Sequence, residues 1–248
     1  MSVDVLAMLK ELGLRAPRET LGALLEQSTR QRWSAAEMLE HLAALERRER
    51  DAANLARRAK AATLGTVAPL DRFDWNHPRH LDRARYEALL SMDFLGQREN
   101  VLLRGPSGVG KTMLAQNLGL RALERGHTVR FVTLAACVAD LLRQESHPAL
   151  ERRLRRYVAP DLLVVDEIGY LPCEPRAADL LFQIVARRHE HRSTVVTTNL
   201  SFKQWGTVFP GAACVTALVD RFVQHCHVLD IDADSWRQRP GRGRARID

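Results

Sequence analysis

Apolar residues follow a helical spacing through the beginning of the chain. Over residues 5–12 and 21–25 they return every three or four positions and would form one face of a helix. A third run begins after Ser34, whose separation from Glu37 is that of a capping box, in which each side chain bonds to the other residue's backbone N–H. That run extends to about residue 64 and is stopped by Gly65. The pattern therefore predicts a small region built only of helices.

After a turn-rich linker at about residues 65–78, short apolar runs alternate with amphipathic ones. The short runs, which are typical of buried strands, lie at residues 101–104, 128–133, 161–167 and 193–199. The amphipathic runs, which predict helices, lie from residue 113 onward and at residues 134–144, 150–158, 177–188 and 201–208. The alternation indicates an α/β domain with buried parallel strands.

The first strand leads into a glycine-rich turn that fits the Walker A pattern G-x-x-x-x-G-K-[ST]. Its glycines let backbone N–H groups point toward phosphates, and the following helix adds the positive end of its dipole. Lys111 would reach the β- and γ-phosphates of ATP, and the Thr112 hydroxyl would bind Mg²⁺. The expected nucleotide ligands are Gly105, Pro106, Ser107, Gly108, Val109, Gly110, Lys111 and Thr112.

Two carboxylates end the apolar run at residues 161–167. In an open α/β sheet, acids at the carboxyl end of a central strand face the ligand crevice. We therefore expect Asp166 to bind Mg²⁺ as the Walker B acid and Glu167 to polarise the attacking water. Without the phosphate loop upstream, the pair could equally start a surface loop. With the loop, it indicates ATP hydrolysis.

The composition of the chain indicates an anionic partner. The chain has 248 residues with 46% hydrophobic and 27% charged, enough for one large domain and a small one. Lys and Arg outnumber Asp and Glu by 37 to 30, which favours nucleic acid as a partner. No apolar run approaches the roughly 20 residues of a membrane-spanning helix, and the start lacks the basic segment of a signal peptide. We expect a cytoplasmic protein with no membrane partner.

Arginine is concentrated in two of the predicted helices. The candidate DNA contacts are Arg47, Arg50, Arg57 and Arg58 on the long helix, and Arg152, Arg153, Arg155 and Arg156 just before the Walker B strand. Guanidinium groups without a base-reading motif would contact the phosphates of duplex DNA largely independently of sequence. The alternatives are a solvated helix face for both sets, a partner-docking helix for the first and an edge facing a neighbouring subunit for the second.

Phe73 and Trp75 lie in the linker. We interpret them as anchors packed on the core of the second domain, and the alternative is stacking on a nucleobase. Asn199 ends the strand at 193–199. From the residues alone it could hold the lytic water or touch the γ-phosphate, or it could cap the helix at 201–208.

Several ordered motifs give the chain a family resemblance. The runs LVVDEIGYLP from Leu163 and LLFQIVARRHEHRSTVVTTNLSFKQW from Leu180, followed by LVDRF from Leu218 and DSWR from Asp234, resemble the IstB group of transposase-helper ATPases. These are AAA+ proteins related to the DnaC-type helicase loaders. The similarity runs from about residue 70 to residue 239 and implies an AAA+ P-loop fold with a five-stranded parallel sheet, preceded by a small helical domain.

The resemblance also assigns roles to single residues. Asn199 matches the sensor after the fourth core strand, and Arg221 matches the arginine that these ATPases offer to a neighbour's γ-phosphate. Arg237 aligns with the arginine of a carboxyl-terminal Ser-Tyr-Arg motif that senses nucleotide, although Trp236 stands here in place of the tyrosine. The expected domains are residues 1–66, which would bind DNA or a partner, residues 67–239, the ATPase, and residues 240–248, a basic flexible tail.

The sequence thus predicts an ATP- and Mg²⁺-dependent helper of transposition. It would assemble as a homo-oligomer on double-stranded DNA, hydrolyse ATP with stimulation by DNA, and recruit or activate a transposase. Two alternatives remain: a DnaC-like loader of a replicative helicase, and a nucleotide-switched adaptor that hydrolyses little.

Overall fold

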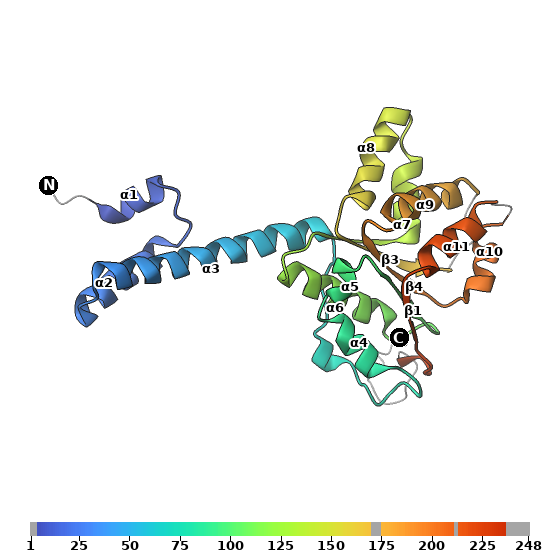
Figure 1. Cartoon of the computed structure of the whole chain (residues 1–248), viewed down its shortest axis with the longest axis horizontal. Helices are drawn as coiled ribbons and strands as arrows, with labels where there is room; N and C mark the ends of the chain where they lie inside the picture. Colours follow the sequence, from blue (N-terminus) through green and yellow to red (C-terminus); the bar gives the residue numbers. More distant parts are fainter. Residues whose placement is uncertain (1–3, 170–174, 211–212, 237–248) are drawn as a thin grey trace, which may run out of the picture. The chain divides into compact units, whose positions relative to one another are not determined.

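The computed structural model describes residues 4–169, 175–210 and 213–236. The chain forms two compact units, Met1–Arg57 and Arg58–Asp248, which are coloured along the sequence in Figure 1.

The division falls inside helix α3 (Ala35–Ala62), upstream of the expected limit at residue 66. The last turns of α3 belong to the second unit because their side chains pack there. Ala62 is fully buried, and the Arg58 guanidinium donates a hydrogen bond to the Leu123 carbonyl at 3.1 Å. A helix that continues from one unit into the other leaves no change of composition for the sequence to reveal.

The first unit contains α1 (Val5–Glu11), α2 (Arg18–Gln31) and most of α3. The predicted capping box at the start of α3 is confirmed. The Ser34 N–H donates to the Glu37 carboxylate at 2.7 Å, and the Glu37 N–H donates to the Ser34 hydroxyl at 3.2 Å. These reciprocal bonds satisfy two backbone donors and fix where the helix begins.

The second unit is built on one five-stranded sheet in the order β2-β3-β4-β1-β5. All neighbouring strands are parallel, which confirms the predicted parallel sheet. The strands are β1 (Asn100–Arg104), β2 (Val129–Thr133), β3 (Leu162–Ile168), β4 (Ser193–Thr198) and β5 (Cys226–Asp230). The central position of β1, β3 and β4 explains their continuous apolar runs, because both of their faces are covered.

Helices cover both faces of the sheet (Figure 1). Helix α6 (Lys111–Glu124) packs on one face, against β1 to β4. The other face carries α7 (Leu134–Leu142), α8 (His147–Val158), α9 (Pro175–Arg188), α10 (Trp205–Val208) and α11 (Val215–Val223). The remaining helical segments are η1 (Leu70–Arg72), α4 (Arg83–Leu89), α5 (Asp93–Gly96) and η2 (Phe202–Gln204).

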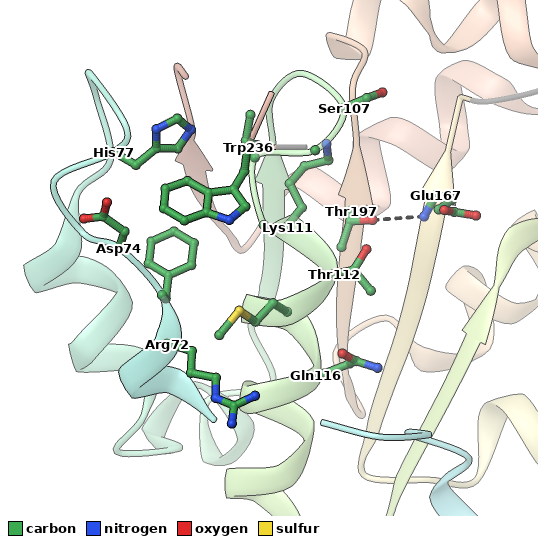
Figure 2. A pocket seen from close by; sticks show the side chains of 15 residues that line it. Arg72, Asp74, His77, Ser107, Lys111, Thr112, Gln116, Glu167, Thr197 and Trp236 are labelled. Carbon is green, nitrogen blue, oxygen red and sulfur yellow. Dashed lines mark hydrogen bonds between the residues drawn. The ribbon is translucent and has the colours of Figure 1, made fainter. Parts of the chain in front are cut away.

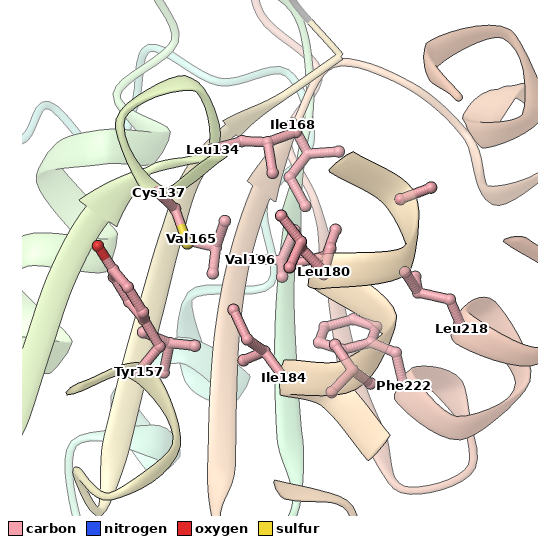
Figure 3. Packing of buried hydrophobic residues seen from close by; sticks show 14 of the residues in the cluster. Leu134, Cys137, Tyr157, Val165, Ile168, Leu180, Ile184, Val196, Leu218 and Phe222 are labelled. Carbon is pink, nitrogen blue, oxygen red and sulfur yellow. The ribbon is translucent and has the colours of Figure 1, made fainter. Parts of the chain in front are cut away.

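The apolar face of α9, which the amphipathic pattern of residues 177–188 predicts, belongs to a core cluster of buried residues (Figure 3). Leu180 and Ile184 of α9 are buried together with Val165 of β3 and Val196 of β4. Phe222 of α11 belongs to the same cluster and is 1% exposed. Full burial of such a side chain contributes about 1.5–3 kcal/mol, so this cluster holds the strands that carry the acidic residues in place.

The ladder between β3 and β4 contains a bulge at the site-bearing end. Val165 pairs with Val196, but the next pair is Ile168 with Thr198. Asp166 and Glu167 together therefore face a single β4 residue. A bulge of this kind re-aims the side chains of the strand that carries the extra residue.

Among the helices that the structure describes, none is long and apolar enough for a membrane crossing.

Candidate functional site

The Walker A turn joins the carboxyl end of β1 to the first residue of α6. Gly108 and Gly110 have φ of 80° and 96°, in the left-handed region that favours glycine. A side chain at either position would also clash with its surroundings. A Cβ on Gly108 would lie 2.3 Å from the Ser235 hydroxyl, and one on Gly110 would lie 2.6 Å from the Phe73 ring. The turn is therefore closely packed against two other segments of the chain.

Lys111 is held at the base of this turn. It is 6% exposed, and its Nζ donates hydrogen bonds to the carbonyls of Gly105 at 2.8 Å and Pro106 at 2.6 Å. These bonds to its own loop keep the ammonium within the cavity that the turn encloses (Figure 2). A positive charge in that place can attract an anionic ligand.

The next residue along α6 contacts the predicted metal-binding acid. The Thr112 hydroxyl lies 3.0 Å from one carboxylate oxygen of Asp166 and 3.2 Å from the other. Asp166 is 3% exposed and also accepts a hydrogen bond from the Thr197 hydroxyl of β4. A buried carboxylate beside a hydroxyl supplies the hard oxygen ligands that Mg²⁺ prefers, so these residues fit the ion.

Glu167 lines the same cavity as Lys111 and Thr112, but its side chain is exposed. Its φ of 64° is uncommon for a residue with a side chain. The Glu167 N–H donates to the Thr197 hydroxyl at 2.9 Å, which is the dashed line in Figure 2. The bulged backbone thus separates the two acids, with one carboxylate buried and the other at the cavity wall.

Asn199 follows β4 at the same edge of the sheet and is exposed. It does not cap the next helical segment, because Ser201 and Gln204 form a capping box there. Its amide oxygen lies against Gly169, where an added Cβ would be only 2.8 Å away. Asn199 borders a shallow hollow beside Gly105 rather than the main cavity.

The main cavity has a volume of about 420 Å³ and is shown in Figure 2. The Walker A turn, Glu167 and Thr197 form one side of it. The other side consists of residues 72–74 and 77 together with Trp236. Sequence reasoning did not assign Arg72, Asp74, His77, Met113, Gln116, Thr197 or Trp236 to this site.

Aromatic side chains from distant parts of the chain meet in the far wall. The Trp236 ring lies edge-on to the His77 ring with centroids 4.8 Å apart, and the backbone N–H of Trp236 donates to the Gly108 carbonyl at 3.1 Å. Phe73 is 8% exposed and also contacts the cavity. Trp75 does not line it but packs against Phe73 and Tyr86. Both rings are therefore packed on the second unit, as expected of anchors, and Phe73 in addition lines the cavity.

Ion pairs fasten the segment that carries Trp236. Arg79 pairs with Asp232 at 3.1 Å and with Asp234 at 3.3 Å. Hydrogen bonding to Asp232 raises the pKa of the Arg79 guanidinium. Closer to the turn, Arg104 donates to both oxygens of Asp230 at 2.5 and 2.6 Å, and this pairing raises the pKa of Arg104. These ion pairs hold the chain after β5 against Arg79, and the end of β5 against the end of β1, where the Walker A turn begins.

Arg221 lies on α11 and does not line the cavity. Its guanidinium carbon is 4.8 Å from the centroid of the Phe182 ring. Arg237, the other arginine that the resemblance singled out, lies outside the described residues. So do the residues of the expected basic tail.

The candidate DNA contacts divide into exposed and engaged arginines. Arg58 and Arg153 are engaged, because Arg58 donates to a backbone carbonyl and Arg153 forms an ion pair with Asp140 at 2.5 Å. Arg50 forms an i,i+4 pair with Glu46 at 2.6 Å. Arg50 is exposed despite this pair, and the other exposed candidates are Arg47, Arg57, Arg152, Arg155 and Arg156. Helix α8 therefore presents three exposed arginines, Arg152, Arg155 and Arg156.

Comparisons with known proteins identify the family of the chain. The family model described as IstB-like ATP binding protein matches residues 7–243. An ATP-binding protein of insertion sequence IS5376 from Geobacillus stearothermophilus is 34% identical over 231 residues, which cover 93% of this chain and 92% of the relative. The corresponding protein of insertion sequence IS21 from Pseudomonas aeruginosa is 36% identical over 220 residues, covering 89% and 83%.

Solved structures support the fold. The crystal structure of DnaI superposes with a TM-score of 0.54 at 18% identity, over 71% of this chain and 92% of that one. A likeness at this identity concerns the fold alone, which is that of the AAA+ P-loop proteins. The match of the family model over residues 7–243 and the two relatives make the chain a member of the IstB-like ATP binding protein family.

Proposed function

We propose that this protein is an ATP-dependent DNA-binding helper of transposition, which assembles on target DNA and recruits or activates a transposase. One observation carries the ATPase part of the proposal. Lys111, Thr112 and Glu167 line one cavity, and the Thr112 hydroxyl bonds to Asp166, although β1 and β3 are separated by 57 residues. This supports a site that both binds a triphosphate and acts on it.

The cavity accommodates the parts of a nucleotide in order. Its volume of about 420 Å³ falls within the roughly 300–1,000 Å³ that is usual for small-molecule sites. The phosphates would lie in the Walker A turn, with Lys111 at the β- and γ-phosphates. The planar base would lie toward Phe73 and Trp236, whose rings can stack on it.

Each polar residue has a defined task in hydrolysis. Thr112 and Asp166 would hold Mg²⁺, which neutralises charge on the β- and γ-phosphates. The Glu167 carboxylate would orient and polarise the attacking water, and Asn199 would contact that water or the γ-phosphate from the neighbouring strand. Because the Asn199 side chain borders a separate hollow, its task requires the side chain to turn toward the nucleotide.

The position of Arg221 supports a site shared between subunits. Within one chain Arg221 faces Phe182 instead of the cavity. If it acts on a γ-phosphate, that phosphate belongs to a neighbouring copy. We therefore propose that the active form is a homo-oligomer, assembled on ATP and DNA, and that DNA stimulates turnover by gathering subunits.

The proposed partners, DNA and a transposase, rest on the charge of α8 and on the relatives of the chain. The exposed arginines of α8 supply contacts for DNA phosphates, which would be largely independent of sequence. The relatives named above are ATP-binding proteins of insertion sequences. Such an element requires a transposase, which makes a transposase the expected protein partner.

Two measurements test the proposal. ATP turnover is measured with and without duplex DNA, and we expect stimulation by DNA. ATP binding without appreciable turnover in either condition would favour a nucleotide-switched adaptor. A pull-down with the tagged protein is expected to retain a transposase, whereas retention of a replicative helicase would favour a DnaC-like loader.

A further inference from the structure

One buried hydroxyl contacts both residues of the bulge in β3. Thr197 is 1% exposed and is the β4 residue that faces Asp166 and Glu167 where the register shifts. Its Oγ1 donates a hydrogen bond to the Asp166 carboxylate and accepts one from the Glu167 N–H at 2.9 Å. A threonine hydroxyl has one hydrogen to donate and lone pairs to accept with, so a single group meets both requirements.

The two bonds act on different properties of the acids. The hydrogen bond to Asp166 offsets the free-energy cost of burying its carboxylate, which is high when the carboxylate has no donor. The bond from Glu167 holds its peptide in the left-handed region, with φ of 64°. Non-glycine residues occupy that region only when their surroundings enforce it, and such residues cluster at functional sites. No other described side chain bonds to the Glu167 N–H.

We propose that Thr197 is a positioning residue for hydrolysis, which fixes the direction of the Glu167 carboxylate relative to the carboxylate of Asp166. The inference rests on the proposed ATPase function. The hydroxyl hydrogen of Thr197 is directed at Asp166 and its lone pair at the Glu167 N–H, so Thr197 acts through these two acids. The prediction distinguishes ATP binding, which the Walker A turn supplies, from turnover, which requires the correct placement of Glu167.

The first test compares three variants. Thr197→Val keeps the shape of the side chain and removes the hydroxyl, whereas Thr197→Ser keeps the hydroxyl. The matched control is Thr194→Val, because Thr194 is also buried on β4 but bonds to Arg188 at the other end of the strand. If Thr197→Val does not fold, Thr197→Ala removes the same hydroxyl and gives the same readouts.

We expect kcat of Thr197→Val to fall about tenfold or more, the factor that corresponds to about 1.4 kcal/mol. The dissociation constant for ATP should change less than about threefold, and Thr197→Ser should retain kcat within about threefold, because these bonds do not contact the nucleotide. Thr194→Val should lower Tm without lowering kcat. An unchanged kcat in Thr197→Val, or a loss in Thr197→Ser as large as that in Thr197→Val, would overturn the inference.

The second test does not depend on turnover. Hydrogen exchange of the Glu167 amide, resolved to that residue, reports whether its N–H has an acceptor. We expect exchange at Glu167 to be at least about tenfold faster in Thr197→Val than in wild type or Thr194→Val, and near the wild-type rate in Thr197→Ser. Equal protection in Thr197→Val would overturn the positioning role. If wild type shows no turnover but Glu167 loses protection in Thr197→Val, the proposed function fails while the positioning bond stands.

Discussion

The Arg221 guanidinium of α11 lies over the ring of Phe182 of α9, with its carbon 4.8 Å from the ring centroid. Its Nη1 is buried and has no hydrogen-bond partner among the described residues, and none of the ion pairs in that part of the chain includes Arg221. A buried donor without an acceptor costs about 1–3 kcal/mol. The relationship therefore gives Arg221 a defined position, which is supported by an aromatic face instead of a local acid.

The first prediction follows from this placement. If Arg221 completes the site of a neighbouring subunit, Arg221→Ala and Lys111→Ala are each inactive alone. A mixture should regain part of the turnover, because some interfaces join an intact Lys111 site to an intact Arg221. An arginine placed on a transferring phosphoryl group contributes a factor of about 10³ to 10⁵ in other enzymes.

The control is each variant at the total concentration of the mixture, with DNA present. Formation of mixed assemblies is checked by co-purification of differently tagged subunits. Mixed assemblies that form but hydrolyse no ATP would rule out the action of Arg221 across an interface.

A second prediction separates nucleotide binding from hydrolysis. Lys111→Ala should abolish ATP binding, because the ammonium contacts phosphates in the ground state. Glu167→Gln should bind ATP with nearly wild-type affinity and lose turnover by about 10² to 10⁴, the usual contribution of a general base. Fluorescent nucleotide titration and phosphate release measure the two quantities. Equal loss of affinity in both variants would remove Glu167 from its assigned role.

The third prediction concerns the exposed arginines of α8. DNA binding should be largely independent of sequence and should weaken steeply with salt. Each phosphate neutralised on duplex DNA adds about 0.9 to the magnitude of the log–log slope. Replacing Arg152, Arg155 and Arg156 with alanine should therefore lower that slope by roughly 0.9 for each arginine that contacts a phosphate.

A variant of equal charge provides the control. Arg83, Arg98 and Arg125 are exposed in the same unit but were not predicted as DNA contacts. Their combined replacement with alanine changes the net charge equally and should leave most of the slope intact. If the magnitude of the salt slope falls equally in both triple variants, the arginines of α8 contribute only through the net charge of the protein. Much tighter binding to one DNA sequence would contradict contact through phosphates.

The fourth prediction concerns stability at low pH. Asp140 of α7 accepts hydrogen bonds from Arg153 at 2.7 Å and from Tyr157 at 2.5 Å, both on α8. Burial alone would raise the pKa of Asp140, but the bonds from Arg153 and Tyr157 outweigh it and lower the pKa below the ordinary value of 3.8. A carboxyl whose pKa is lower in the folded state contributes stability above its unfolded pKa. The contribution is lost as the pH falls through the folded pKa.

Asp140→Asn should therefore lower the free energy of unfolding at pH 7 by roughly 1.5–3 kcal/mol, the range for hydrogen bonds that involve charged groups. The difference from wild type should shrink below about pH 4 as Asp140 becomes protonated. Urea unfolding at a series of pH values measures both effects. A difference that stayed constant from pH 7 to pH 3 would show that the charge of Asp140 does not stabilise the link between α7 and α8.

Local patterns in the sequence determined the elements and the chemistry of the phosphate side. The Walker A turn, the acids that end β3 and the capping box at Ser34 all depend on residues within a few positions of one another. Such spacing translates directly into geometry, because a turn, a strand end or a cap is formed by neighbours in the chain. Fold class followed from the alternation of strands and helices and from the family resemblance. The short helices α4 and α5, and the bounds of β5, were not predicted.

Tertiary structure decided the rest of the site, because it brings together residues that no local pattern links. His77 and Trp236 are separated by more than half of the chain, yet their rings form one wall of the cavity. Arg58 donates a hydrogen bond to a backbone carbonyl of α6. Its position on a charged helix face did not predict this contact. The bond between Thr197 and Glu167 depends on a register shift between two strands. A one-residue bulge leaves no signature in hydrophobic periodicity, because a buried strand has no apolar–polar alternation for the extra residue to interrupt. Only the pairing with β4 reveals where the extra residue lies.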